Sequence, residues 1–394
     1  MLSQYRHFFR TLANGSLVSL VRRAARLRRV ARGMLAAVDR PELPVRLQVE
    51  TTDICNFRCV MCTREVLDGM NTRSMPLADF AKLVSSVQPY YVTLNGLGEP
   101  LIDKTIFDKL ALLHRANIKS SMPTNGTYIR RQKLTCLAEN LPDNLVFSVD
   151  GATKESFEAI RVLSNFDQVI GNYRAISALK AEGKTRAGTT IRILCALQRG
   201  NMRDFRAMYL LWKSLPGNPI FNLVPVFDFD PDGRAYQSVV PSKNEVPELL
   251  AEIDAAIEKA PKRDERKFYV AWRAAAGAWL ENVGTNRVNP ETNHASCAVP
   301  WFSTYIDAKG RVYPCCYLTA TPHVMGNIHD KEFREIWHGD TYSRFRREVA
   351  HNRPNLEGCR TCPRNDKSVM RALKRLRPLL GNDPAATGFL NLQD

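Results

Sequence analysis

Residues 50–62, with the sequence ETTDICNFRCVMC, hold three cysteines spaced CxxxCxxC: Cys55, Cys59 and Cys62. They follow a short β-rich run at 45–51, which places them in the loop after the first strand that we expect. A [4Fe–4S] cluster normally takes four thiolates, so three close cysteines leave one iron open for a ligand from outside the protein. Zinc usually takes CxxC pairs and four protein ligands. The spacing therefore favours an iron–sulfur cluster, and the polar loop argues against three buried thiols.

Downstream of this loop, short β-rich runs alternate with amphipathic helical stretches. We expect strands at 45–51, 90–95, 118–123, 144–149, 189–197 and 220–226, with helices at 77–88, 102–116, 128–140, 153–161, 168–182 and 201–214. Strands separated by helices predict an α/β fold with a parallel sheet and right-handed crossovers, here a partial (β/α)6 TIM-like barrel. Ligands of such sheets bind at the C-terminal ends of the strands, where the cysteine loop would lie.

Three more motifs each follow one of these expected strands. They are Gly96-Leu97-Gly98-Glu99-Pro100, Thr124-Asn125-Gly126, and the pair Ser148 and Asp150. A lone GEP or TNG marks only a turn or the start of a helix. Taken in order with ETTDICNFRCVMC, however, these motifs resemble the signature of the radical S-adenosylmethionine (SAM) superfamily, over roughly residues 45–230.

The resemblance implies a chemistry and a set of ligands. Cys55, Cys59 and Cys62 would hold a [4Fe–4S] cluster whose fourth iron is chelated by SAM, and reductive cleavage of SAM would release a 5′-deoxyadenosyl radical. An electron donor such as flavodoxin or ferredoxin would be a partner. The residues implied to bind SAM are Phe57 near adenine, Gly96, Gly98, Glu99 and Pro100 near the amino group, and Thr124, Asn125, Ser148 and Asp150 near the ribose or methionine part. Leu97 interrupts the glycine pair that is usual in the family.

The last hundred residues carry a second cysteine set, namely Cys297, Cys315, Cys316, Cys359 and Cys362. They also contain a hairpin signal, FSTYIDAKGRVYPCC, with Lys309–Gly310 at its turn, and short helices near 331–337 and 340–350. Four soft thiolates bind zinc or an iron–sulfur cluster, and both alternatives stay open on spacing alone.

This layout resembles the auxiliary-cluster domains of radical SAM enzymes, called SPASM and twitch. The resemblance implies a second [4Fe–4S] cluster on Cys297, Cys315, Cys359 and Cys362, with Cys315 favoured over Cys316 because Pro314-Cys315 fits the family spacing. A CxxCx5CxxxC run, typical of full SPASM domains, is missing. A single closed auxiliary cluster is implied, which would accept an electron from the substrate.

The chain carries 56 Lys+Arg against 40 Asp+Glu, a net charge of +16, and nine of the arginines lie in residues 1–45. Such an excess favours acidic partners. Residues 16–38 have helical periodicity with an apolar face, so this helix either lies on an anionic membrane or packs on the domain with its arginines in water. We find neither a secretion signal nor an apolar run long enough to span a membrane. We therefore expect a cytoplasmic protein, with peripheral contact at the inner face of the membrane as the alternative.

We divide the chain into a basic N-terminal helix (1–44), a radical SAM barrel (45–230), a helical segment and linker (231–296) and an auxiliary-cluster domain (297–394). Helices are expected at about 243–259 and 265–282.

The catalytic candidates outside the motifs are Asp228, Asp230 and Arg192. The two aspartates follow the sixth strand, whereas Arg192 lies within the fifth and either faces SAM or an acidic substrate or forms a buried ion pair. Cys136 and Cys195 are expected in the core.

Three functions are compatible with these patterns. The first is hydrogen abstraction from a small polar substrate, such as a sugar, an aminocyclitol or a lipid precursor. The second is maturation of a ribosomally made peptide, although only about 44 residues precede the first strand, too few for a winged-helix leader-binding domain. The third is a non-enzymatic metal protein associated with a membrane or nucleic acid, which leaves the ordered motifs unexplained. We expect no nucleic-acid partner.

Overall fold

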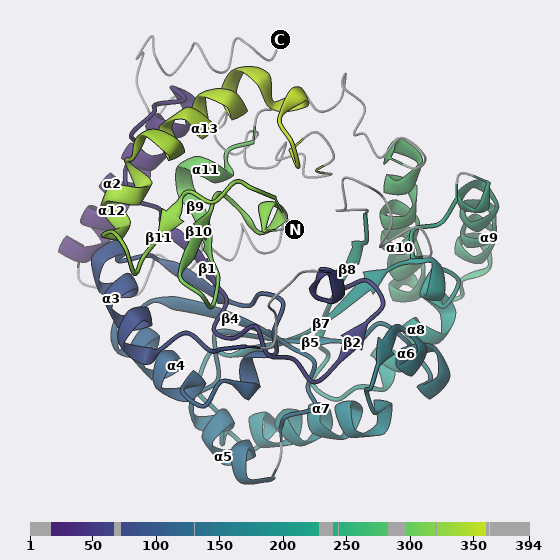
Figure 1. Ribbon diagram of the computed structural model, residues 1–394. Helices are drawn as coiled ribbons and strands as arrows, with labels where there is room; N and C mark the ends of the chain where they lie inside the picture. The colour runs from purple at the N-terminus through teal and green to yellow at the C-terminus, as the bar shows by residue number, and fades with distance from the viewer. Residues whose placement is uncertain are drawn as a thin grey trace.

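A computed structural model of the protein describes residues 17–66, 72–129, 131–227, 239–242, 244–282, 297–319, 321–359 and 362. Its centre is a curved sheet with the strand order β11-β10-β9-β1-β3-β4-β5-β7-β8 (Figure 1). The strands that follow the expected alternation are β1 (Arg46–Val49), β3 (Tyr91–Leu94), β4 (Lys119–Thr124), β5 (Asn144–Ser148), β7 (Thr190–Leu197) and β8 (Ile220–Pro225). In the part of this sheet with the order β1-β3-β4-β5-β7-β8, every neighbouring pair of strands is parallel. The partial barrel predicted from the sequence is therefore confirmed.

Helices cover the outer face of this sheet (Figure 1). They are α3 (Leu77–Val87), α4 (Ile106–Arg115), α5 (Arg131–Glu139), α6 (Lys154–Ile160), α7 (Phe166–Ala181) and α8 (Phe205–Ser214). In α3 the buried residues Phe80, Leu83, Val84 and Val87 recur at helical spacing, so a single apolar stripe faces the sheet. They share one core with Leu47, Val49, Val92 and Leu94 of the strands. Short 3-10 helices lie at η2 (Thr63–Val66), η3 (Pro100–Ile102), η4 (Arg199–Asn201), η5 (Cys316–Leu318) and η6 (Arg353–Asn355).

The predicted C-terminal hairpin is confirmed as β9 (Ser303–Ile306) and β10 (Arg311–Tyr313), with Gly310 at φ +80° in the turn. Unexpectedly, β9 pairs in parallel with β1, so the C-terminal region continues the barrel sheet. The antiparallel strand β11 (Gly326–Asn327) and the helices α11 (Val299–Phe302), α12 (Phe333–Trp337) and α13 (Asp340–Asn352) complete this region. The loop of the first cysteine set and Cys315 of the second set therefore follow strands of the same sheet.

Two further helices, α9 (Glu245–Lys259) and α10 (Arg263–Asn282), pack against each other, and α10 also packs against β8 and α8. Their core contains the fully buried Trp272 and Trp279. The indole nitrogens of these residues donate to the carbonyls of Met202 and Val226. The predicted loop and linker between these elements, and with them Asp228 and Asp230, lie largely or wholly outside the described residues.

The basic helix expected at 16–38 is α2 (Leu17–Leu35). Val30, Ala31 and Met34 on its apolar face are buried in the main core, so this face packs on the protein. Side chains of the C-terminal region fix the segment that follows α2: Trp301 donates to Val38 O at 2.9 Å and Arg346 to Asp39 O at 2.8 Å. The structure thus favours the packed alternative for the helix over insertion of its apolar face into a bilayer. Among the described residues, no helix is both long and apolar enough to cross a membrane.

Candidate active site

The three cysteines of the first set lie in the loop that follows the C-terminal end of β1, and all three are half-buried. Part of this loop forms β2 (Arg58–Cys59), which pairs with β6 (Arg161–Val162) after α6. The Cys62 N–H donates to Cys59 O at 3.0 Å, so the turn brings these two cysteines together. Burial raises the pKa of the Cys55 thiol and raises the pKa of Cys59 to about 12. A cationic metal centre reverses this effect because it stabilises thiolates.

Polar donors surround these thiols. Nδ2 of Asn125 lies 4.0 Å from Cys55 Sγ and donates to Asn56 Oδ1 at 2.9 Å. Nη1 of Arg161 lies 3.8 Å from Cys59 Sγ. Hydrogen bonds to cluster sulfurs are one of the means by which a protein sets the potential of an iron–sulfur centre. The donor set therefore suits a cluster held by thiolates.

Arg161 is a site residue that the sequence analysis missed. Its Nη2 forms an ion pair with Asp150 Oδ2 at 2.7 Å, and Asp150 Oδ1 accepts from the Ala196 N–H at 2.7 Å. Both side chains are nearly inaccessible to solvent. Asp150, predicted to contact SAM, is thus placed to orient the cation beside Cys59. The signal in the sequence was an arginine at the end of the helix that follows Ser148 and Asp150.

The glycines of the second motif allow close approach of the backbone. A Cβ on Gly96 would overlap the Glu50 side chain, and a Cβ on Gly98 would overlap the Thr52 carbonyl. The loop before Pro100 can therefore lie directly against the cysteine loop only if both residues lack side chains. Pro100 itself begins η3 and is buried.

Glu99 joins this motif to the third one. Its Oε1 accepts from Thr124 Oγ1 at 2.7 Å and from the Leu101 N–H at 3.1 Å, and its Oε2 accepts from the Asn125 N–H at 2.7 Å. The side chain is buried, and burial raises its pKa. Glu99 thus fixes the position of Thr124 and Asn125; its predicted contact with SAM stays a prediction.

Glu50 is a second residue that the sequence analysis missed. It accepts from the Leu97 N–H at 2.7 Å and from the Ala308 N–H at 3.1 Å, and burial raises its pKa to about 7. One carboxyl group therefore connects the glycine loop to the β9–β10 hairpin. Its signal was slight, a single acidic residue at the end of an apolar strand.

The remaining predicted residues of the barrel take separate positions. Phe57 belongs to the main core and is 1% exposed, and Ser148 is buried at the end of β5. Arg192 is buried and donates to Asn144 Oδ1 at 2.9 Å, and Asn144 in turn donates to Tyr91 Oη at 3.4 Å. These three side chains form a polar network that spans β3, β5 and β7, away from the cysteine loop.

In the C-terminal region, Cys297, Cys315, Cys359 and Cys362 line one cavity with apolar neighbours such as Leu318, Phe345 and Val349. Burial, followed by the four nearby cysteines, raises the pKa of Cys315. Cys316 instead lines a neighbouring cavity with Cys315, Tyr305 and Gln48. Cys315 lines both cavities, and its role as the ligand in place of Cys316 stays a prediction.

No three of the described Cys, His, Asp and Glu side chains converge closely enough to hold a single metal ion. An iron–sulfur cube spreads its ligands more widely than a tetrahedral zinc ion does. Outside the two sets, Cys195 is buried as expected, but the prediction for Cys136 was wrong because its side chain is exposed. Leu137 and Ala138 are the buried residues of that helix turn.

Comparison with known families decides whether these cysteines belong to iron–sulfur or to zinc proteins. Residues 49–207 match the radical SAM superfamily, and residues 297–363 match the SPASM iron–sulfur cluster-binding domain. The chain belongs to the radical SAM superfamily. This radical SAM enzyme therefore uses SAM and a [4Fe–4S] cluster, and its SPASM domain binds auxiliary iron–sulfur.

The radical SAM enzyme has several curated relatives. It is 24% identical to the AdoMet-dependent heme synthase of Methanosarcina barkeri, over 77% of this chain and 84% of the relative. It is 25% identical to the mycofactocin maturase MftC of Mycobacterium tuberculosis, over 78% and 73%. The PqqA peptide cyclase of Gluconobacter oxydans is 20% identical, over 83% and 85%. The structure of Streptococcus suis SuiB bound to precursor peptide SuiA shares the fold, with a TM-score of 0.57 and 14% identity over 89% of this chain and 75% of SuiB.

Proposed function

We propose that this radical SAM enzyme modifies a peptide by abstracting a hydrogen atom from one of its C–H bonds. The observation that carries the proposal is the match, over 78% and 83% of this chain, to relatives named as a mycofactocin maturase and a PqqA peptide cyclase. The end strand β8 adds support: Ile220 and Val224 are each 43% exposed there, beside an edge that is unpaired within the described residues. An exposed strand edge with apolar side chains is a known docking element for extended peptides.

In this proposal the two cysteine sets hold the two kinds of cluster. Cys55, Cys59 and Cys62 would hold the cluster that binds SAM, and Cys297, Cys315, Cys359 and Cys362 would hold an auxiliary cluster. When bound, these groups supply a 5′-deoxyadenosyl radical that takes the hydrogen atom and an acceptor for the electron left on the substrate. Because SAM cleavage is reductive, the proposal includes an electron donor such as flavodoxin or ferredoxin.

The polypeptide itself would position the reactants. Gly96 and Gly98 keep the glycine loop against the cysteine loop, and Glu99 holds Thr124 and Asn125 beside Cys55. We propose that this surface, together with Phe57, Pro100, Ser148 and Asp150, forms the SAM site. Arg161 would balance the negative charge of the thiolate at Cys59 and of the SAM carboxylate.

A small polar substrate, such as a sugar, an aminocyclitol or a lipid precursor, is the second candidate. It is favoured by the match to a relative named as an AdoMet-dependent heme synthase, whose name points to a small molecule rather than a peptide.

The two candidates can be separated with extracts of the source organism. The anaerobically reconstituted enzyme would be given SAM, dithionite and either the 1–10 kDa or the sub-1 kDa fraction, each with and without prior protease treatment. We expect the larger fraction to raise 5′-deoxyadenosine formation above the substrate-free rate, and protease to abolish the increase. An increase that comes from the small fraction and survives protease would replace the proposal with the second candidate. No increase from either fraction would contradict both. The variant with Cys55, Cys59 and Cys62 changed to alanine is the control.

A further inference from the structure

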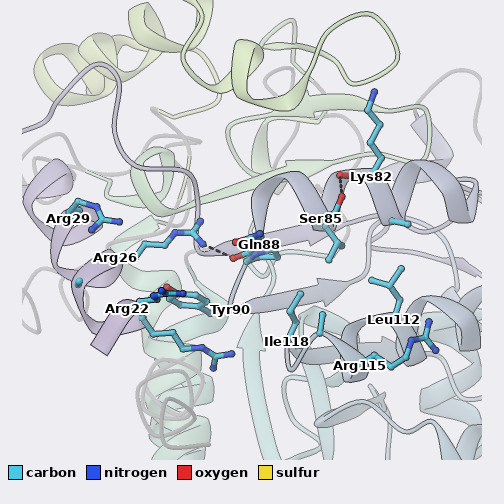
Figure 2. Close-up of a pocket in the computed structure, with 16 residues that line it drawn as sticks. Arg22, Arg26, Arg29, Lys82, Ser85, Gln88, Tyr90, Leu112, Arg115 and Ile118 are labelled. Carbon is cyan, nitrogen blue, oxygen red and sulfur yellow. Dashed lines mark hydrogen bonds between the residues drawn. The ribbon is translucent and has the colours of Figure 1, made fainter. Parts of the chain in front are cut away.

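A large basic cavity lies at the end of the barrel opposite the cysteine loop. It has a volume of about 1180 Å³ and is bounded by α2 on one side and by α3 and α4 on the other (Figure 2). Its lining includes Gln88, Pro89 and Tyr90, which precede β3, and Ala116 and Ile118, which precede β4. The cavity is therefore at the N-terminal ends of these strands, whereas the SAM loops follow their C-terminal ends. We call it the basic groove.

All the charged residues that line the basic groove are cations. They are Arg22, Arg23, Arg26 and Arg29 of α2, Lys82 of α3 and Arg115 of α4. Arg22, Arg26 and Arg29 recur at i, i+4 and i+7, which places them along one face of the helix. A concave surface with charges of one sign concentrates the field and attracts ligands of the opposite sign.

Some of these cations serve the fold. Arg26 donates to Gln88 O at 2.6 Å and to Val87 O at 3.0 Å, and it lies over the Tyr90 ring at 5.2 Å. Arg29 is paired with Glu42, and Lys82 with Glu332. Figure 2 shows the Lys82 ammonium directed away from the cavity. The charges of Arg26, Arg29 and Lys82 therefore already have partners within the protein, and these residues serve mainly as walls of the groove.

Arg22 and Arg115 differ from them. Both side chains are exposed, and they lie on opposite sides of the cavity (Figure 2). Among the described residues, neither forms a salt bridge within 4.0 Å or a side-chain hydrogen bond. Between them lies an apolar floor, made by Val84, Leu112 and Ile118 and the Tyr90 ring. The groove thus combines two available guanidinium groups with an apolar base.

We propose that the basic groove binds an acidic, amphipathic segment of the peptide that this enzyme modifies. Carboxylates of the segment would pair with Arg22 and Arg115, and its apolar face would cover the floor. This inference rests on the proposed function, because it names the part of the substrate that is recognised away from the reacting C–H bond.

The shape of the groove decides among anionic partners. A bilayer presents a broad surface that cannot enter a recess, and the apolar residues of α2 that would insert, such as Val30 and Met34, are buried. A small inorganic anion would leave the apolar floor and most of the volume unused. A peptide segment of one or two helical turns uses both features.

The test is binding of a defined probe to the reconstituted protein without SAM. The probe is a fluorescently labelled 15-residue peptide with leucine at i, i+3, i+4 and i+7 and glutamate elsewhere, followed by fluorescence anisotropy. We expect saturable binding that Arg22→Glu and Arg115→Glu each weaken by about tenfold or more, since each replaces a charge-assisted hydrogen bond with repulsion between like charges. Arg28→Glu is the matched control, because Arg28 is an exposed residue of α2 that does not line the groove. It should weaken binding by about twofold at most.

Several results would overturn the proposal. The first is an equal loss of affinity for the probe in Arg28→Glu and in Arg22→Glu. The second is unchanged affinity for a probe with glutamine in place of glutamate. The third is that the wild type does not bind the probe. Tighter, groove-dependent binding of phosphatidylglycerol vesicles, tripolyphosphate or a 15-mer oligothymidylate would assign the groove to another ligand. Circular dichroism and iron content confirm that the variants fold. If the probe binds but the peptide fraction never stimulates SAM cleavage, the proposed function fails while the groove remains a peptide site; the reverse result removes only the groove.

Discussion

The two cysteine sets use the same ligand atom in different surroundings. Cys55, Cys59 and Cys62 are half-buried on a loop, and Nη1 of Arg161 lies 3.8 Å from one of their sulfurs. The second set lines a cavity whose other neighbours are mostly aliphatic and aromatic, together with the buried Arg353, and Cys359 and Cys362 are only 8% and 7% exposed. Three thiols on a half-buried loop suit a cluster that must admit SAM, whereas four thiols around one cavity suit a closed cluster. We infer that the number of protein ligands distinguishes the two roles.

The largest expected effect comes from removing the cation of the first set. Arg161→Met leaves the Asp150 carboxylate buried without its ion-pair partner, which typically costs about 3–5 kcal/mol of folding free energy. Anaerobic urea unfolding measures this loss. The double variant Arg161→Met with Asp150→Asn should recover much of it, because no charge then remains buried. A loss below about 1 kcal/mol, or a double variant no more stable than the single one, would show that the pair is not a buried unit.

Glu50, which joins the glycine loop to the β9–β10 hairpin, should make the stability of the protein depend on pH. Its pKa is raised from 4.5 to about 7 in the folded state, so the folded protein binds the proton more tightly than the unfolded chain does. Stability from this group is complete below the unfolded pKa and is lost as pH rises through about 7. The loss is on the order of 3 kcal/mol.

The variant Glu50→Gln should lack this part of the pH dependence. Urea midpoints of the wild type and the variant at pH 5, 6, 7 and 8 provide the comparison. We expect the wild type to lose stability relative to the variant as pH rises from 5 to 7 and the difference to level off above that. Parallel curves would contradict the raised pKa.

A smaller effect tests the close packing of the SAM loops. Gly98→Ala would place a Cβ on the Thr52 carbonyl, and overpacking of this kind costs about 1–3 kcal/mol. Gly171 in α7 is the matched control: a Cβ there meets no atom within 4 Å, so Gly171→Ala should stabilise the helix by about 0.5–1 kcal/mol. Thermal or urea unfolding that shows the same sign for both substitutions would contradict this account.

The smallest effect concerns cysteines outside both sets. Cys136→Ser should change neither the iron content nor the stability by more than about 0.5 kcal/mol, because the side chain is exposed. Cys195→Ser should also retain all the iron but lose about 1–2 kcal/mol, since Cys195 is fully buried. Loss of iron in either variant would mean that the clusters extend beyond the two sets.

The sequence was informative where structure depends on local pattern. Alternating β-rich and helical periods located all six barrel strands, and β5 at Asn144–Ser148 differs from its predicted range by one residue. The first cysteine set was also readable, because its members lie within one short loop. Cys136 was predicted to be buried because its sequence neighbours are apolar. The prediction failed because Cys136 lies on the exposed face of its helix, whereas Leu137 and Ala138 lie on the buried face.

Features that depend on contacts between segments far apart in the sequence could not be predicted from the sequence alone. The pairing of β9 with β1 joins segments more than 250 residues apart, and neither strand carries a local sign of its partner. The same holds for Arg161, which reaches Cys59 only because β6 pairs with β2. The basic groove likewise requires α2 to pack against the bottom of the barrel, whereas periodicity shows only that the helix has an apolar face.

The central claim is that the first cysteine set binds the cluster that cleaves SAM and that the second set binds a separate cluster. Its most direct test is iron content and 5′-deoxyadenosine formation, with SAM and dithionite, after anaerobic reconstitution. The wild type should hold about eight irons. The Cys55/Cys59/Cys62→Ala variant should hold about four and form no 5′-deoxyadenosine, whereas the Cys297/Cys315/Cys359/Cys362→Ala variant should hold about four and still cleave SAM. SAM cleavage by the first variant, or its loss from a folded second variant that keeps four irons, would contradict this assignment of the two sites.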